Sequence, residues 1–200
     1  MLLKFCAFFQ TNKIICFHPL GSGHGHDRIV RSGQEQTFCS IPTLLSKGGS
    51  LYANALGVYL QFANHIVVCP VSSTTAGIRV AVEPFQVLPS SVSPIDLGEA
   101  VHCALEDSRE NVPQPTDWHS FAVPRLAAAG VKTEAAFQKK SQLVSAEFNG
   151  TVLKITPNRN GGAAGAKKGF ETAVEHEAIV NGTSPEAVGI AAFLAFDFCG

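Results

Sequence analysis

Apolar and polar residues alternate over two stretches of the chain, and a short polar pair interrupts each stretch. VYLQF and HIVVCP (residues 58–70) flank an Ala-Asn pair, and VSAEF and TVLKITP (residues 144–157) flank Asn149-Gly150. Each stretch is predicted to form a β-hairpin. The signal is stronger in the second, because both residues of Asn149-Gly150 accept the positive φ that a tight type I′ turn needs. Pro70 and Pro157 are expected to end the hairpins, because proline has no N–H to donate to a ladder.

Other segments carry the start and stop signals of helices. Ser93-Pro94 and Ser184-Pro185 each combine a capping side chain with a proline that loses no hydrogen bond at the first helical position. Pro42 and Pro124 are expected to open two shorter helices that stop at the glycines that follow. Further strands are predicted at 78–82 with 86–88 and at 171–180, and an additional hairpin at residues 2–17.

The order of these elements indicates an internal duplication. Three blocks recur in the same order with offsets of 82 to 91 residues, namely 38–49 with 121–131, 58–70 with 144–157, and 93–105 with 184–196. We therefore predict two tandem copies of a helix–hairpin–strand–helix unit. The expected fold class is α+β, with antiparallel sheets and helices packed on one face. The expected repeats span residues 1–110, which include the additional hairpin, and 117–200, and they pack as one globular unit.

Composition excludes several general classes of function. Apolar residues make up 46% and charged residues 16% of the 200 positions, which is typical of a globular chain and not of a disordered one. The net charge of −1 gives no overall field for nucleic acid, and no apolar run reaches the length of about 18 residues that a membrane helix needs. The N-terminal run lacks the features of a signal peptide, and the six cysteines show no CxxC spacing. We expect a cytoplasmic protein without a cofactor.

Charge is distributed unevenly along the chain. Residues 83–117 contain seven acidic side chains and one basic side chain, Arg109. In the helix that follows Ser93, acidic residues recur at helical spacing and share one face with Cys103, whereas the equivalent positions of the second helix are apolar. We therefore expect the first helix to expose an acidic face and the second helix to be buried between layers.

Two glycine-rich segments contain residue types that could support binding or catalysis. The segment from His18 to Asp27, HPLGSGHGHD, has imidazole and carboxylate groups that could ligate zinc or iron, so a metal-dependent enzyme is the alternative functional hypothesis. The segment from Asn160 to Gly169 has glycines and lysines but departs from the phosphate-binding P-loop pattern. Solvent-exposed polar loops are the simpler interpretation of both segments, and no arrangement of residues predicts an active site.

The second half of the chain resembles the CDI immunity proteins, which protect bacteria against the toxins of contact-dependent growth inhibition. The residues that carry the resemblance are Trp118, Phe121, Pro124, Leu126, the run from Ala129 to Lys132, Phe137, the run from Phe148 to Gly150, the run from Ile155 to Gly162, Gly169 and Phe170, together with an LGxAVxxAL pattern at Leu97–Leu105. The resemblance covers residues 90–200, and the longer glycine loop and the apolar last helix depart from it. It implies a non-enzymatic cytoplasmic protein that binds and blocks the toxic C-terminal domain of an exoprotein, commonly a nuclease.

This expectation agrees with the acidic residues of the chain. Nuclease domains present positive surface to phosphate, so an inhibitor gains association rate and specificity from negative charge. The residues expected to face the toxin are Asp96, Glu99, Glu106, Asp107, Glu110, Glu171, Glu175 and Glu177.

Overall fold

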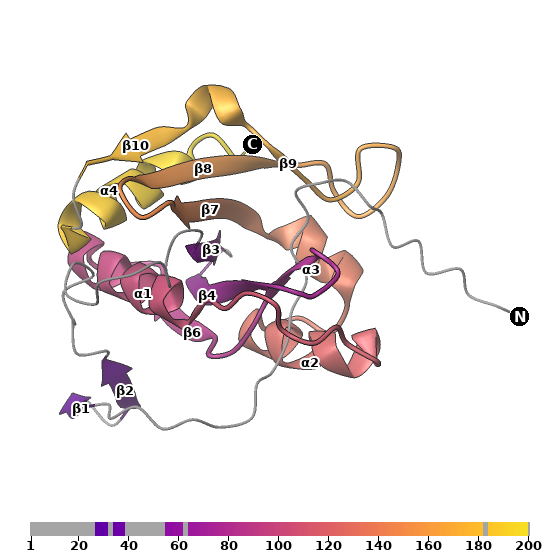
Figure 1. The fold of residues 1–200 in the computed structure, drawn as a ribbon, viewed down its shortest axis with the longest axis horizontal. Coiled ribbons are helices and arrows are strands. Elements are labelled where there is room, and N and C mark those ends of the chain that lie inside the picture. The colour runs from indigo at the N-terminus through magenta and orange to yellow at the C-terminus, as the bar shows by residue number, and fades with distance from the viewer. Residues whose placement is uncertain (1–26, 32–33, 39–54, 62–63, 182–183, 200) are drawn as a thin grey trace, which may run out of the picture.

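A computed structural model describes residues 27–31, 34–38, 55–61, 64–181 and 184–199 of the chain (Figure 1). The strands in these residues are β1 Asp27–Arg31, β2 Gln34–Phe38, β3 Ala55–Gln61, β4 His65–Ser73, β5 Arg79–Ala81, β6 Gln86–Pro89, β7 Gln142–Phe148, β8 Leu153–Asn160, β9 Phe170–Thr172 and β10 Ala178–Val180. The helices are α1 Pro94–Asp107, α2 Trp118–Ala128, α3 Glu134–Lys140 and α4 Pro185–Phe196, and a 3-10 turn, η1, spans Val174–His176.

Eight strands form one antiparallel sheet, and β1 and β2 form a separate two-stranded sheet. The order β10-β8-β7-β3-β4-β5 runs across the large sheet, with β6 paired to β4 and β9 paired to β8. The two predicted hairpins are confirmed as β3–β4 and β7–β8. Because β3 also pairs with β7, the two halves of the chain share this sheet. The mixed α+β class with antiparallel sheets is as expected.

The strands do not end at the two prolines, so that expectation was wrong. Both β4 and β8 continue for three residues beyond them. The Pro70 carbonyl oxygen accepts from the N–H of Val82 at 2.8 Å, and the Pro157 carbonyl oxygen accepts from the N–H of Ala173 at 2.9 Å. A proline removes one donor from the ladder, and its carbonyl still joins the next strand. The predicted strand over 171–180 is two short strands, β9 and β10, with η1 between them.

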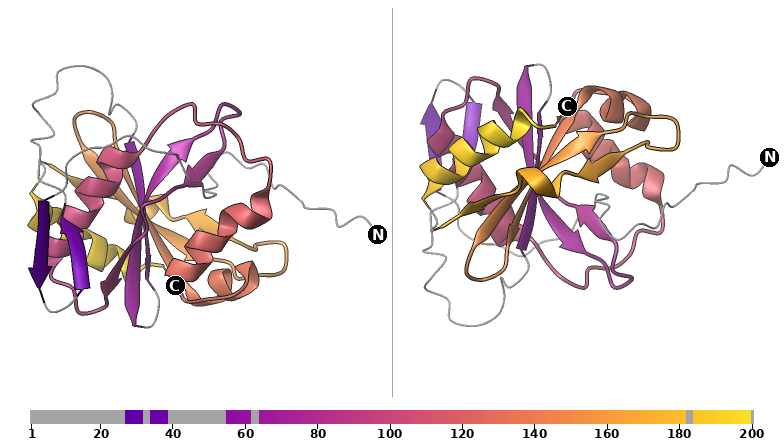
Figure 2. Two further views of the ribbon diagram at one scale, coloured as in Figure 1. Left: turned by 90° about the horizontal axis from the view of Figure 1, so that it is seen from below. Right: turned by 90° about the horizontal axis from the view of Figure 1, so that it is seen from above.

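Helices cover both faces of the large sheet, which corrects the expectation that they lie on one face. On β4, Ile66 and Val68 pack with α1 and α4, whereas Val67 and Cys69 pack with α2 and α3 on the opposite face. Figures 1 and 2 show the two helix pairs on either side of the strands. A continuous apolar run such as IVVCPV is typical of a strand that is buried on both faces.

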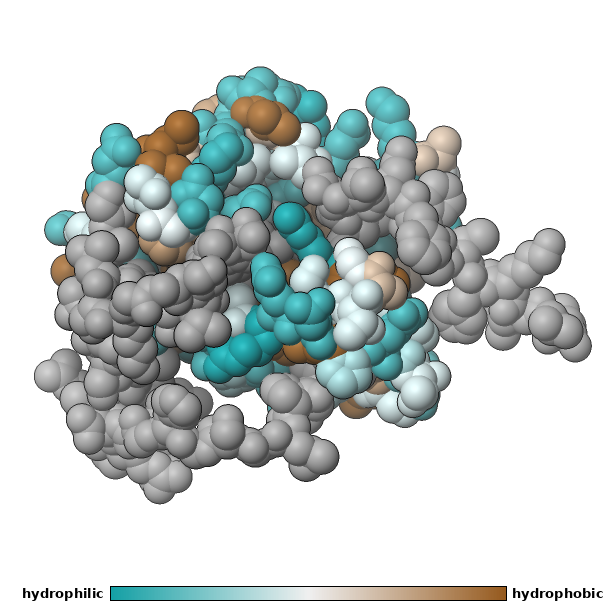
Figure 3. All heavy atoms as spheres, in the orientation of Figure 1, coloured by the Kyte–Doolittle hydropathy of each residue, from teal (hydrophilic) through white to brown (hydrophobic). Residues whose placement is uncertain are grey.

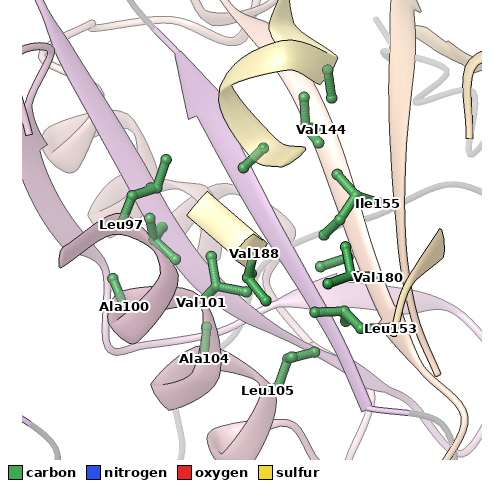
Figure 4. Packing of buried hydrophobic residues seen from close by; sticks show 14 of the residues in the cluster. Leu97, Ala100, Val101, Ala104, Leu105, Val144, Leu153, Ile155, Val180 and Val188 are labelled. Atoms are coloured by element: carbon green, nitrogen blue, oxygen red, sulfur yellow. The ribbon is translucent and has the colours of Figure 1, made fainter. Parts of the chain in front are cut away.

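The larger core lies between the sheet and the pair α1 and α4 (Figure 4). Leu97 and Val101 of α1 and Val188 of α4 are fully buried against sheet residues that include Ile155. The Ser93 hydroxyl caps α1 by accepting from the N–H of Asp96 at 3.2 Å, so the predicted helix start is confirmed.

The second helix pair starts at other residues than the sequence predicted. Pro124 was expected to open a helix, but it lies inside α2, which Asp117 caps by accepting from the N–H of His119 and of Ser120. A carboxylate at the cap satisfies free N–H groups that a proline cannot, because its side chain has no acceptor. The sequence analysis did not identify α3, which Thr133 caps. The predicted helix after Pro42 and the hairpin at residues 2–17 lie outside the described residues.

Two general features of the described residues bear on function. None of their helices combines the length and the apolar character that crossing a bilayer would need. Cys69, Cys103 and Cys199 are buried thiols.

Candidate protein-binding surface

The burial of the two main helices differs from the prediction at several residues. On α1, Cys103 was expected on the acidic outer face, but it is only 7% exposed, and the residues around it are buried as well. On α4, which was expected to be buried, Leu194 is 58% exposed and Ile190 is 45% exposed. The helix α1 packs over the central strands β3 and β4, whereas α4 packs over β8 and the outer strand β10. The position across the sheet therefore decided which helix is more exposed, and residue hydrophobicity did not.

Five of the acidic residues predicted to bind a partner lie on α1 or just after it. Asp96 and Glu110 are exposed, and Glu99, Glu106 and Asp107 are partly exposed. The Asp96 carboxylate accepts from the Ser93 hydroxyl at 2.7 Å, so it also stabilises the start of the helix. The C-terminal end of α1 is held against β4, where the N–H of Arg109 donates to the Ser72 hydroxyl at 3.0 Å.

The other three acidic residues lie around β8, β9 and η1. Glu175 forms an exposed ion pair with Arg159, and Glu171 is opposite Arg159 in the β8–β9 ladder. The carboxylate of Glu177 lies 3.0 Å from the Lys154 amine. A hydrogen bond to its own backbone N–H, together with the charge of Arg159, holds the pKa of Glu175 below its ordinary value. Glu175 is therefore ionised at neutral pH.

The strand register places two sets of these acidic residues at opposite ends of the sheet. The end of β4 is level with the end of β7, whereas the end of β8 is level with the start of β7. Glu106, Asp107 and Glu110 therefore lie near one end of the sheet, and Glu171 and Glu175 lie near the other. The eight residues do not form one continuous patch.

An exposed apolar stripe lies beside the second acidic group. Ile190, Leu194 and Phe198 follow one another at four-residue spacing along α4 and just beyond its end. The Phe198 ring stacks on the ring of His176 in η1, with the centroids 4.2 Å apart and the planes inclined by 13°. Val174, two residues before His176, is also exposed. We call Val174, His176, Ile190, Leu194 and Phe198 the α4 stripe.

The surface around the α4 stripe combines apolar and charged residues. Figure 3 shows brown apolar residues among teal polar ones over β10 and over the 3-10 turn. The acidic residues Glu171, Glu175, Glu186 and Asp197 are exposed around the stripe; Arg159 pairs with Glu175, and Lys154 pairs with Glu177, next to His176. An apolar centre with a charged rim is the usual composition of a protein–protein interface.

The end of α4 is anchored to the sheet by hydrogen bonds. The Cys199 thiol donates to the carbonyl oxygen of Leu143 at 3.2 Å and to that of Ala195 at 3.4 Å. Burial raises the pKa of the Cys199 thiol, which therefore stays protonated at neutral pH and remains a donor. The Gln142 amide reaches the Phe196 carbonyl oxygen at 3.5 Å.

The glycine-rich segment after β8 is an ordered turn in this structure. The N–H of Gly161 donates to Gly169 O at 2.8 Å, which closes the turn. A Cβ on Gly161 would lie 1.7 Å from the Lys167 carbonyl oxygen, so no larger residue fits there. The Asn160 amide group donates to Ser141 O at 2.7 Å and joins this turn to the end of α3. The backbone hydrogen bonds and close contacts of this turn therefore explain why glycine occurs here, and no phosphate ligand is needed to explain it.

The described residues contain no group of three His, Cys, Asp or Glu side chains that could hold a metal ion. The segment from His18 to Asp27, which carries the alternative hypothesis, lies outside the residues whose side chains are described. His176, expected to be a strand residue, belongs to η1 and to the α4 stripe. Sequence reasoning missed the stripe because its apolar periodicity was attributed to a buried core.

Comparisons with known proteins identify solved structures of similar fold and a family model that matches the chain. The fold is similar to that of a protein of unknown function from Neisseria meningitidis, with a TM-score of 0.63 and 19% identity over 77% of this chain and 100% of that chain. It is also similar to a chain in a CdiA-CT/CdiI toxin and immunity complex from Yersinia pseudotuberculosis, with a TM-score of 0.58 and 17% identity over 76% of this chain and 100% of that chain. A comparison with curated proteins gives no match. Residues 65–199 match the family model described as CDI immunity protein, which covers more than half of the sequence. The chain therefore belongs to the CDI immunity protein family.

Proposed function

We propose that this protein binds and neutralises the C-terminal toxin domain of a contact-dependent growth inhibition exoprotein. The observation that carries the proposal is the family match over residues 65–199, from β4 to the residues that follow α4. The similar fold in the toxin and immunity complex from Yersinia pseudotuberculosis supports it. Neutralisation requires a stable complex and no chemical step, so the protein acts by binding, not by catalysis, in the cytoplasm where the toxin would act.

We further propose that the toxin is a nuclease and that acidic residues of this protein recognise it. A nuclease presents cationic side chains to phosphate, and an opposed acidic surface speeds association and rejects wrong partners. Because the strand register places Glu106, Asp107 and Glu110 near one end of the sheet and Glu171 and Glu175 near the other, we treat these two sets as separate candidate surfaces. No contribution of nucleic acid, membrane or cofactor is needed for this function.

The test uses the C-terminal toxin domain of a contact-dependent growth inhibition exoprotein from the same genome as this chain. Co-expression of the full-length protein with a tagged toxin domain is expected to restore growth and to yield a stoichiometric complex on purification. The matched control is the toxin domain that is paired with a different immunity protein. This domain is expected neither to bind nor to be neutralised, because specificity is set pair by pair. Growth arrest with the cognate toxin, in cells that contain folded protein, would refute the proposal.

A metal-dependent enzyme that uses the segment from His18 to Asp27 remains the second candidate. The residues His18, His24, His26 and Asp27 are of the types that ligate zinc and iron. Elemental analysis of purified protein separates the two candidates, since stoichiometric metal that is lost in the variant H24A/H26A would favour the enzyme. An immunity protein is expected to contain no stoichiometric metal and to keep neutralising the toxin in that variant.

We also infer that the fold consists of two copies of one unit, in residues 1–110 and 117–200. Pro70 and Pro157 occupy corresponding positions in the two predicted copies. The carbonyl oxygen of each accepts a hydrogen bond from a backbone N–H next to the following strand. Each hairpin carries two further short strands, β5 and β6 on β4 and β9 and β10 on β8. The glycines Gly98 and Gly189 occupy equivalent places at the contact between α1 and α4. These correspondences support the duplication.

A further inference from the structure

We infer that the α4 stripe is the docking surface for the toxin domain, and that the matching surface of the toxin is apolar with a rim of basic side chains. The inference rests on the proposed function and adds to it the place and the chemistry of the contact. It differs from the acidic recognition on α1 that the sequence analysis favoured.

The first argument is the composition of the stripe. Ile190, Leu194, Phe198 and Val174 are large apolar side chains with between 45% and 64% of their surface exposed. Ile190, Leu194 and Phe198 share one side by their four-residue spacing, and the His176 ring stacks on Phe198 and so links η1, which also carries Val174, to the end of α4. Apolar and aromatic side chains that cluster in this way supply most of the energy of a protein interface when a partner removes them from water.

The second argument is charge complementarity. Four exposed carboxylates, those of Glu171, Glu175, Glu186 and Asp197, surround the stripe, and Arg159 partly offsets them. This rim is negative, so it attracts a basic partner and repels an acidic one. A second copy of this chain would bring the same negative rim against itself. The surface therefore fits a basic toxin domain better than it fits self-association.

The third argument is that the surface is already in place before a partner arrives. The crossing of α1 and α4 leaves no space for a Cβ on Gly189, which would lie 1.8 Å from the Pro94 carbonyl oxygen. The thiol of Cys199 and the amide of Gln142 fix the end of α4 to the sheet. A rigid surface loses little conformational entropy on binding, so more of the contact energy appears as affinity.

The experiment replaces Leu194 with lysine and, separately, with glutamate, and measures the Kd for the cognate toxin domain. Both residues favour a helix and remove the same apolar group, so they differ in the sign of the charge. Both variants are expected to bind about 10- to 100-fold more weakly than the wild type. L194K is expected to be the weaker of the two, by about tenfold at low salt, and raising the salt concentration is expected to reduce this difference.

The matched control is V123A on α2, which packs on the opposite face of the sheet. Val123 is 53% exposed, so it tests the loss of an exposed apolar side chain away from the stripe. Its Kd is expected to equal that of the wild type. Circular dichroism and the urea midpoint check that each variant is folded, and F198A provides a second truncation in the stripe.

The outcomes separate this inference from the proposed function. If the wild type binds the toxin and both Leu194 variants bind equally well, the docking surface is elsewhere while the proposed function stands. If L194E is weaker than L194K, the rim of the toxin is acidic and the inference is wrong. Light scattering could instead show that the free wild type is a dimer and that L194E is a monomer. This result would assign the stripe to a second copy of the chain and would also overturn the inference. No binding by the wild type would refute the proposed function itself.

Discussion

Gly98 of α1 lies against Pro185 of α4 so closely that a Cβ built on the glycine would be 1.8 Å from the Pro185 carbonyl oxygen. The reciprocal contact joins Gly189 of α4 to the carbonyl oxygen of Pro94. Each glycine thus permits the backbone of the other helix to approach, and the pair brings the first turns of α1 and α4 together over the core.

These contacts predict that G98A and G189A each destabilise the protein. Alanine favours a helix over glycine by about 1 kcal/mol, but a contact of 1.8 Å with a backbone atom forces the helices apart. The loss is expected to be about 1–3 kcal/mol, as for other overpacked sites. The urea midpoint measures it, with E186A on the exposed side of α4 as the control.

The double variant G98A/G189A gives a sharper test. If the helices separate to accommodate one added methyl group, they also make room for the other. The double variant is therefore expected to lose less free energy of unfolding than the sum of the losses in the two single variants. Strict additivity would show that the two contacts are relieved independently and would contradict the shared crossing.

Asn160 predicts a second effect on stability. Its side-chain amide donates to the carbonyl oxygens of Gln138 and Ser141, at 2.5 Å and 2.7 Å. N160D replaces this donor with a carboxylate oxygen that faces two carbonyls, and we expect a loss of about 1–3 kcal/mol in the free energy of unfolding.

The matched control for this variant is N149D. The Asn149 side chain uses its oxygen to accept from the N–H groups of Thr151 and Val152. Aspartate accepts equally well, so the urea midpoint of N149D is expected to stay close to that of the wild type. Equal losses in N160D and N149D would refute the role of the Asn160 donor.

Cys199 predicts a dependence of stability on pH. Burial raises the pKa of this thiol above its ordinary value of 9.0 in the folded protein. At pH values below 9.0 the thiol is protonated in both states, so stability is unaffected. As the pH rises above 9.0, the unfolded state ionises first and stability falls.

The measurement compares the wild type with C199A at pH 7 and pH 10. The urea midpoint of the wild type is expected to fall more over this interval, and the other cysteines contribute equally to both proteins. The native thiol is also expected to resist alkylation at pH 7, because the thiolate is the reactive form. Rapid alkylation of Cys199 in the folded protein would contradict its burial.

The separation of the acidic residues predicts that the two groups affect toxin binding unequally. The pair E171K/E175K, beside the α4 stripe, is expected to reduce the association rate by about tenfold at low salt and less at high salt. The pair E106K/E110K, at the other end of the sheet, is expected to have a smaller effect. Stopped-flow mixing with the toxin domain measures both, and the reverse order would move the docking surface to α1.

The local elements could be predicted because short-range chemistry sets them. The β7–β8 turn and the Ser93 cap depend on residues within four positions, and both lie where the sequence placed them. The turn itself differs from the prediction, because residues 149–152 form a loop in which Gly150 has a positive φ and Asn149 does not, and the Asn149 side chain accepts hydrogen bonds from Thr151 and Val152. Pro124 does not mark a helix start, because the neighbouring residues decide whether a proline lies in the first turn of a helix or inside it. The capping carboxylate of Asp117 was the sequence feature that could have located the start of α2.

The candidate surface depended on contacts between distant segments. Leu194 and Cys103 occupy corresponding positions in the two matched helices, and their hydrophobicity alone predicts that Leu194 is the more buried. The structure reverses this order, because α1 lies over the middle of the sheet and α4 lies near its edge.

The sequence by itself determined the two hairpins, the starts of α1 and α4, and the resemblance to a family, since each depends on neighbouring residues or on a motif. The tertiary structure alone decided that β3 pairs with β7, that helices cover both faces, and that the acidic residues form two groups. Burial is a property of the whole arrangement of layers, and a helix presents its apolar side to solvent or to a core according to where the sheet places it.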